Sequence, residues 1–187
     1  MEKITRRTDL IIDPGDPMAR YTLNLIDRRV DLPVHDTKKY GFRAWGGRVT
    51  IHHSLTQGGS ADAFSRYHVE TNNWPGIGYH YVVEKNGDIA WCWDHNVRSY
   101  HAGKHNAYML GICLTGNFLV QHLEEPQHMA CLWLLHDILN IKPENVFGHS
   151  ELEGYDWKDC PSLSMKDLRY DYVKYCERRI GSSPGSP

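Results

Sequence analysis

The residues best suited to chemistry lie in a short stretch near the carboxyl end of the chain. Within it, His149, Glu151, Lys158 and Cys160 bring an imidazole, a carboxylate, an ammonium group and a thiol into a dozen positions. A second cluster, Ile51-His52-His53-Ser54, lies about a hundred residues upstream. Histidine and cysteine are preferred donors for zinc. We therefore expect the two clusters to meet in space and to hold one metal ion.

The candidate ligands follow short strands. A catalytic zinc site uses three protein ligands and leaves a fourth position for water or substrate. Segments 48–52 and 145–148 read as strands that end at or just before His52 and His149. Strand ends are rigid enough to hold ligands at about 2.0–2.3 Å from the ion. His52, His149 and Cys160 together make a set of three candidate ligands. Spacing alone leaves open that each histidine is an ordinary surface or hydrogen-bonded residue.

A different zinc chemistry shares part of this pattern. In zinc deaminases a His-x-Glu motif is followed by Pro-Cys-x-x-Cys. Here His149-Ser150-Glu151 is followed by Cys160-Pro161, so the order of the second motif is reversed and its second cysteine is missing. Deamination is therefore disfavoured, and we expect Glu151 to brace a ligand or to face solvent.

Hydrophobic periodicity predicts helices and short strands around these clusters. The Asn86-Gly87 pair between two β-rich runs predicts a hairpin. Residues 94–109 are polar and are expected to form a loop. The expected strands are 48–52, 77–83, 88–93, 110–116 and 145–148, and the expected helices are 60–73 with Ser60 as N-cap, 125–140, and one that begins at Ser164. This order predicts an α/β fold, with a single domain in which a mixed central β-sheet is flanked by about three helices.

The ends of the chain differ from its middle. Residues 1–46 carry only weak strand signals and are expected to be an N-terminal extension of unknown role. Residues 47–180 are expected to form the main domain. Residues 181–187 contain only Gly, Ser and Pro and predict a flexible tail.

Composition narrows the classes of partner. The 187 residues carry a net charge of −2, so there is no electrostatic reason to expect nucleic acid or an anionic membrane as partner. Five cysteines are an odd number, which argues against a disulfide scaffold. The charged N-terminus lacks the apolar run of a signal peptide. We expect a monomer that is made in the cytoplasm and, if it acts elsewhere, is released by other means.

The segment 49–168 resembles the zinc-dependent N-acetylmuramoyl-L-alanine amidases, the group shared by phage lysozyme-type endolysins and peptidoglycan recognition proteins. The matching pieces stand in the family's order, and together they are specific although each is weak alone. They are Ile51-His52-His53-Ser54, Gly78-Tyr79-His80-Tyr81-Val82-Val83, His101-Ala102-Gly103 with His105-Asn106, Gly111-Ile112-Cys113-Leu114-Thr115-Gly116, Gly148-His149-Ser150-Glu151 and Lys158-Asp159-Cys160-Pro161.

The resemblance implies a role for each matching residue. The zinc (Zn²⁺) ligands would be His52, His149 and Cys160, with His52 preferred over its neighbour because the first histidine of the motif is the ligand in the family. Tyr79 would be the catalytic tyrosine, and Lys158 would stabilise charge on the substrate carbonyl. Two residues would border the substrate groove, namely His101 and Asn106.

The resemblance also implies a function for the main domain, which would be an amidase domain. The expected reaction is hydrolysis of the amide bond between N-acetylmuramic acid and L-alanine in peptidoglycan, by a bacteriolytic phage or bacterial endolysin that reaches the cell wall after release. Two alternatives stay open, a peptidoglycan-recognition module that binds without cutting and a cytoplasmic amidase that recycles muropeptides. Binding-only members typically lack the zinc cysteine, and Cys160 is present here.

Overall fold

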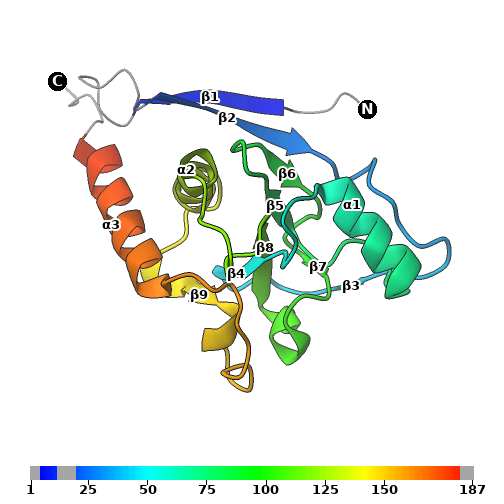
Figure 1. Ribbon diagram of the computed structural model, residues 1–187. Helices are drawn as coiled ribbons and strands as arrows, with labels where there is room; N and C mark the ends of the chain where they lie inside the picture. Colours follow the sequence, from blue (N-terminus) through cyan, green and yellow to red (C-terminus); the bar gives the residue numbers. More distant parts are fainter. Residues whose placement is uncertain (1–4, 12–19, 182–187) are drawn as a thin grey trace.

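The central feature of the fold is a seven-stranded mixed β-sheet, seen in a computed structural model that describes residues 5–11 and 20–181 (Figure 1). The strands lie in the order β1-β2-β6-β5-β8-β4-β9. Two neighbouring pairs, β1/β2 and β5/β6, are antiparallel and the other four are parallel. The sheet consists of β1 (Thr5–Ile11), β2 (Arg20–Asp27), β4 (Arg48–His53), β5 (Tyr81–Val83), β6 (Ile89–Trp91), β8 (Met109–Leu114) and β9 (Val146–Gly148), and β3 (Gly41–Phe42) pairs separately with β7 (Val97–Arg98).

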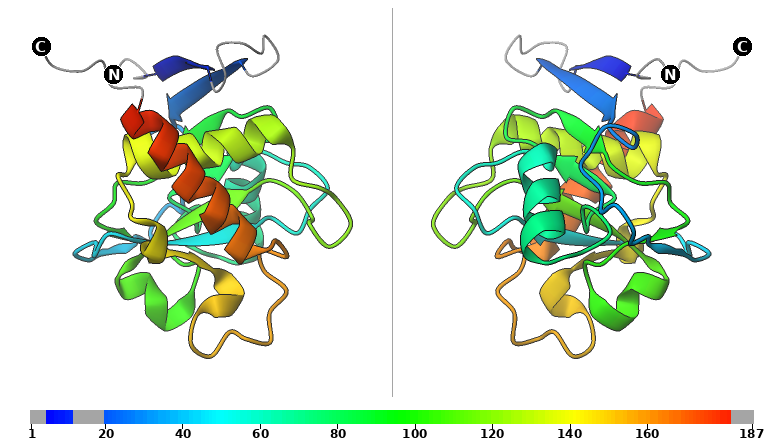
Figure 2. Two further views of the ribbon diagram at one scale, coloured as in Figure 1. Left: turned by 90° about the vertical axis from the view of Figure 1, so that its left-hand side faces the viewer. Right: turned by 90° about the vertical axis from the view of Figure 1, so that its right-hand side faces the viewer.

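Helices cover both faces of the sheet. On one face lies α2 (Glu125–Trp133), which continues as a π-helical segment over Leu134–Ile138. On the same face α3 (Met165–Gly181) crosses α2 (Figure 2). On the other face lies α1 (Ala61–Arg66), which continues as a π-helical segment over Tyr67–Thr71 (Figure 1). Short 3₁₀ turns complete the described chain, at Gly103–Ala107, Pro143–Asn145 and His149–Glu151.

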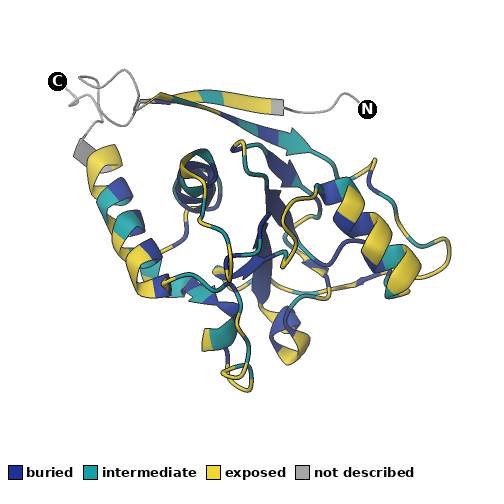
Figure 3. Ribbon diagram, in the orientation of Figure 1, coloured by how far each residue is buried: buried dark blue, intermediate teal, exposed yellow. Residues whose placement is uncertain are grey.

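Successive side chains of each strand point to opposite faces of the sheet, so the core has two layers. Ile51, Val83 and Ile112 pack with α2 and α3 in the larger cluster. Val82 and Cys113, on the opposite face of the same strands, pack with α1. Both layers are buried, whereas the outer sides of α1 and α3 are exposed (Figure 3). The central strands are thus covered on both faces, which is why they read as nearly continuous apolar runs.

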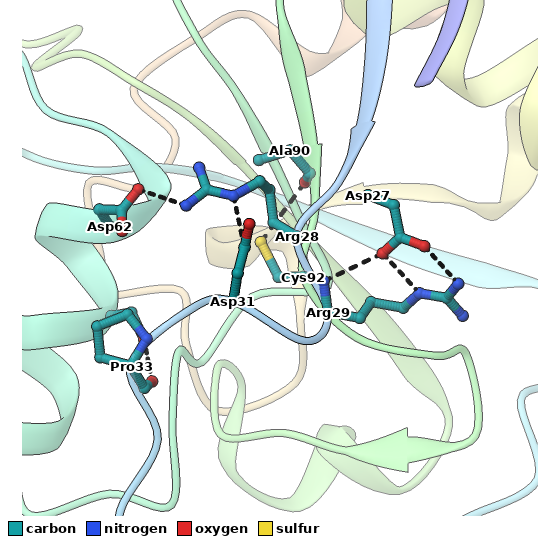
Figure 4. Close-up of polar contacts among 9 residues, drawn as sticks. Asp27, Arg28, Arg29, Asp31, Pro33, Asp62, Ala90 and Cys92 are labelled. Carbon is teal, nitrogen blue, oxygen red and sulfur yellow. Dashed lines mark hydrogen bonds and ion pairs between the residues drawn. The ribbon is translucent and has the colours of Figure 1, made fainter. Parts of the chain in front are cut away.

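The N-terminal strands belong to the same sheet. β2 runs parallel to β6, with Leu25 opposite Ile89. The segment after β2 is tied to α1 by Arg28, which donates hydrogen bonds to Asp31 at 2.7 Å and to Asp62 at 2.6 Å (Figure 4). Residues 20–46 therefore contact the rest of the domain closely.

The predicted α/β class, mixed sheet and three helices are confirmed. The Asn86-Gly87 hairpin is present as β5 and β6, and the side chain of Ser60 accepts a hydrogen bond from the backbone of Ala63 at 3.3 Å as predicted for the N-cap. The expected strand 77–83 was too long, because only Tyr81–Val83 pairs as strand and the Gly78 amide donates instead to the His68 side chain at 3.0 Å.

The expected loop 94–109 is also more structured than predicted. It contains β7 and the 3₁₀ turn Gly103–Ala107. The tail residues 182–187 lie outside the described residues. Among the helices that are described, none has both the length and the apolar character needed to cross a membrane.

Candidate metal centre

Strand register brings the two distant histidines together. β4 pairs in parallel with β9, and Ile51 lies opposite Gly148. The residue after each of these is a histidine, so His52 near the end of β4 and His149 directly after β9 lie side by side at one edge of the sheet. Their ring centroids are 4.6 Å apart, with an interplanar angle of 71°. Neighbouring parallel strands thus convert a separation of about a hundred residues into direct contact.

The cysteine reaches the same point through its loop. The backbone amide of Ser150 donates a hydrogen bond to the carbonyl of Cys160 at 2.8 Å, which holds the loop against the end of β9. The Cys160 Sγ atom lies 3.7 Å from Nδ1 of His52. The candidate ligand atoms of His52, His149 and Cys160 all lie within 4.8 Å of one another. The structure therefore brings together the three predicted ligands.

The end of β9 is held by two further features. A Cβ atom at Gly148 would come within 2.8 Å of Met165 Cγ and 3.0 Å of Pro161 Cδ, so a larger residue would displace the loop or α3. Glu151 accepts a hydrogen bond from the Gly148 amide at 2.9 Å and receives both ends of the Arg169 guanidinium at 2.7 and 2.8 Å. Glu151 thus braces the turn that carries His149.

Burial sets the protonation of these groups. It lowers the pKa of His149 to about 4 and that of His52 well below its usual value, and the nearby Lys158 ammonium lowers both further. Both imidazoles are therefore neutral at pH 7, with a lone pair free for a ligand. Burial raises the pKa of the Cys160 thiol to about 11. A metal ion would have to displace the thiol proton, as is usual for cysteine ligands.

The donor set fits a tetrahedral metal. Nε2 of His149 is buried and has no hydrogen-bond partner within the described part of the chain. Such an orphaned nitrogen is costly unless a metal or water satisfies it. Ligand atoms around a tetrahedral zinc are separated by about 3.5 Å, given bonds of about 2.0–2.3 Å, and the distance between His52 Nδ1 and Cys160 Sγ is 3.7 Å. Two nitrogens and one sulfur leave the fourth position open.

Two cavities flank the three residues. Tyr79 is half-buried, its ring centroid lies 5.4 Å from that of His52, and it lines a cavity of about 480 Å³ beside α1. Lys158 and His149 line a second cavity of about 390 Å³, where the Lys158 Nζ atom lies 5.6 Å from the centroid of the Tyr155 ring. The Tyr79 ring thus lies beside one candidate ligand, and Lys158 shares a cavity with another.

The two residues expected at the groove both line the second cavity. Asn106 is buried, and its side-chain oxygen accepts hydrogen bonds from the backbone amides of His101 at 3.1 Å and Ala102 at 2.7 Å. The ring of His101 contacts His52, with 3.1 Å between Nδ1 and Nε2 respectively. Asn106 therefore shapes the loop, and His101 touches a candidate ligand.

The sequence matches a known family where these residues lie. Residues 47–163 match the family described as N-acetylmuramoyl-L-alanine amidase, a span that covers more than half of the chain and all three candidate ligands. The chain belongs to this amidase family. The family match agrees with the resemblance inferred from the motifs.

Curated relatives of this amidase-family chain fall into two groups. Peptidoglycan-recognition protein SC1a of Drosophila melanogaster is 32% identical over 103 residues, which are 53% of this chain and 54% of the relative. An endolysin of Enterobacteria phage K11 is 26% identical over 107 residues, which are 54% of this chain and 68% of the relative. The first match thus spans about half the length of the curated relative.

Solved structures share the fold. The endolysin amidase LysCS from Clostridium intestinale URNW has a TM-score of 0.66 at 21% identity, covering 80% of this chain and 95% of that one. Drosophila peptidoglycan recognition protein SD has a TM-score of 0.64 at 18% identity, covering 74% of this chain and 88% of that one. The fold of this chain is therefore shared by an endolysin amidase and by a peptidoglycan recognition protein.

Sequence reasoning missed several aromatic residues of the site. Tyr155 lies with its ring centroid 4.6 Å from that of His149, and Trp74 lines the second cavity. His68 stacks on Trp74 at 4.8 Å and lines the first cavity. Trp74 and Tyr155 lie outside the helices and strands, so no periodicity distinguishes them. His68 lies on the π-helical segment that continues α1, where its position on a helix does not indicate which loop residue it contacts.

Proposed function

We propose that the protein is a zinc-dependent amidase that hydrolyses the bond between N-acetylmuramic acid and L-alanine in peptidoglycan, as a phage or bacterial endolysin. The observation that carries the proposal is the convergence of His52, His149 and Cys160 at one edge of the sheet. Tyr79 and Lys158 in the adjoining cavities support it, as does membership of the amidase family. In this proposal the enzyme acts on the cell wall after release from the cell.

The roles follow from the chemistry of an amide. A zinc ion held by the three ligands would lower the pKa of a water molecule and polarise the substrate carbonyl. The Tyr79 hydroxyl would hold and relay a proton during attack of the water and departure of the amine. The Lys158 ammonium would stabilise the negative charge that develops on the carbonyl oxygen. The neutral imidazoles and the deprotonated thiolate of Cys160 would hold the ion and take no other part in the reaction.

The electrostatic role predicts the effect of Lys158→Met. Loss of one group that stabilises an oxyanion typically lowers kcat by about 10²–10³-fold. We expect that loss with zinc content unchanged, because Lys158 is not among the three candidate ligands. Steady-state kinetics on a soluble muropeptide would measure it. Lys104→Met is the matched control, since Lys104 is exposed and pairs with Glu153 rather than facing the cavity of Lys158. Equal loss in both variants would contradict the role.

The bond that is cut decides the function. Digested peptidoglycan should release peptides with new amino-terminal L-alanine, seen by mass spectrometry. New reducing sugars without such peptides would indicate a glycosidase instead.

Removing the metal with a chelator should stop the loss of turbidity of purified walls, and added zinc should restore it. Activity that persists after complete metal removal would refute the mechanism.

Two alternatives make different predictions in the same assay. The first alternative is a module that binds peptidoglycan without cutting it, since some relatives are named as peptidoglycan-recognition proteins. Such a module would sediment with walls yet release no peptide. A muropeptide-recycling amidase would cleave small soluble fragments much faster than intact walls. Retention of Cys160 beside the two histidines favours the catalytic reading over the binding module.

A further inference from the structure

We propose that His101 is a positioning residue, which fixes the tautomer of His52 so that the Nδ1 lone pair of His52 faces the metal. The inference deepens the proposed function and rests on it, because it concerns how the zinc ligand is prepared. It assigns to His101 a role inside the protein, whereas the family resemblance placed it at the border of the substrate groove.

The proton positions follow from a chain of three contacts. The carbonyl of Met109 can only accept, and it lies 3.1 Å from Nε2 of His101, so that nitrogen carries the proton. In the neutral ring, Nδ1 of His101 is then an acceptor. It lies 3.1 Å from Nε2 of His52, which must donate to it. The remaining nitrogen of His52, Nδ1, is therefore unprotonated, and it lies 3.7 Å from Cys160 Sγ.

The ring of His101 is held in place on several sides. Its backbone amide donates to the Asn106 side chain, and its ring lies against the backbone of β8 at Met109 and Gly111. A Cβ atom at Gly111 would lie 2.7 Å from the His101 Cγ atom and 2.9 Å from its Nδ1 atom. Only glycine at this position of β8 leaves room for the ring. His101 thus has a fixed orientation before any metal or substrate binds.

The arrangement leaves little for a substrate to bind at His101. Both ring nitrogens already have partners, Met109 and His52. A hydrogen bond to substrate would require breaking one of the two internal bonds. A ligand histidine usually donates its second ring N–H to a partner that fixes its tautomer and orientation, and loss of such a partner typically weakens metal binding by about 10–100-fold.

The decisive measurement is the tautomer of His52 in the metal-free full-length protein. Two-bond ¹H–¹⁵N correlation spectra of protein with ¹⁵N-labelled histidine should show His52 protonated at Nε2. In His101→Phe we expect a mixture of the two tautomers, because the ring volume is kept and the acceptor is lost. His101→Asn should keep the Nε2–H form, since the Asn side-chain oxygen branches from the same atom as Nδ1. An unchanged tautomer in His101→Phe would overturn the proposal.

Zinc affinity gives the second readout, measured by competition with a chromogenic chelator. His101→Phe should weaken zinc binding by about 10–100-fold, and His101→Asn should recover most of the loss. His105→Phe is the matched control, since His105 is a buried histidine of the same loop whose ring nitrogens contact Tyr108 and Glu153. Unchanged affinity with a raised KM in His101→Phe would instead show a substrate contact and refute the proposal. If the wild-type protein bound no zinc, the proposed function would fail, while the tautomer would still be measured.

Discussion

Replacing Cys160 with serine is expected to abolish zinc retention and wall hydrolysis while the fold survives. Cys160 is the sulfur donor among the three candidate ligands, and a serine hydroxyl supplies neither a thiolate charge nor a soft donor atom. The side chain is only half-buried in a loop, so the change opens no core cavity. We expect zinc affinity to fall by more than the roughly 10–100-fold that loss of a supporting residue causes.

The measurement is zinc content after dialysis against a weak chelator, together with turbidity loss of purified walls. Cobalt substitution adds a direct signature, because the thiolate-to-cobalt charge-transfer band should vanish in Cys160→Ser. Cys176→Ser is the matched control, since Cys176 is also a half-buried free cysteine but lies on α3. A Cys160→Ser protein that keeps its zinc would show that another residue completes the site.

Much of the site could be predicted because it depends on strand ends. Apolar segments that end at or just before a histidine predicted strands that deliver His52 and His149 to one edge of the sheet. Parallel pairing of β4 with β9 makes these residues neighbours. An α/β order favours parallel pairing, but it did not specify that these two strands are adjacent. The hairpin at Asn86-Gly87 could also be predicted, because two adjacent turn residues are enough to indicate it.

What could not be predicted depends on contacts between loops. Gly78 stays outside β5 because its amide donates a hydrogen bond to the side chain of His68, which lies on the π-helical continuation of α1. The contact between His101 and His52 depends on the room that Gly111 leaves on β8. No periodicity encodes either contact, since both arise only when separate segments pack. The sequence therefore predicts the candidate ligands better than it predicts the residues that orient them.

Replacing Tyr79 with phenylalanine is expected to slow turnover by about 10²-fold or more while zinc binding is unchanged. Such a loss corresponds to about 2.7 kcal/mol in the activation free energy, at 1.36 kcal/mol for each factor of ten. Burial raises the pKa of the Tyr79 hydroxyl well above its usual value, and the neighbouring Cys113 and Cys160 raise it further. The hydroxyl therefore keeps its proton at neutral pH, as a group that holds and relays a proton requires.

Phenylalanine removes the hydroxyl and keeps the ring that lies against His52. Comparing the two proteins therefore tests the role of the hydroxyl alone. Steady-state kinetics on a soluble muropeptide, with zinc content measured in parallel, would check the prediction. Tyr67→Phe is the matched control, because Tyr67 lines the same cavity but is 56% exposed. Near-normal turnover in Tyr79→Phe would remove the tyrosine from the mechanism. Loss of zinc from Tyr79→Phe would instead mean that the hydroxyl supports the metal site, and the proton would then have to be handled by another group in the cavities.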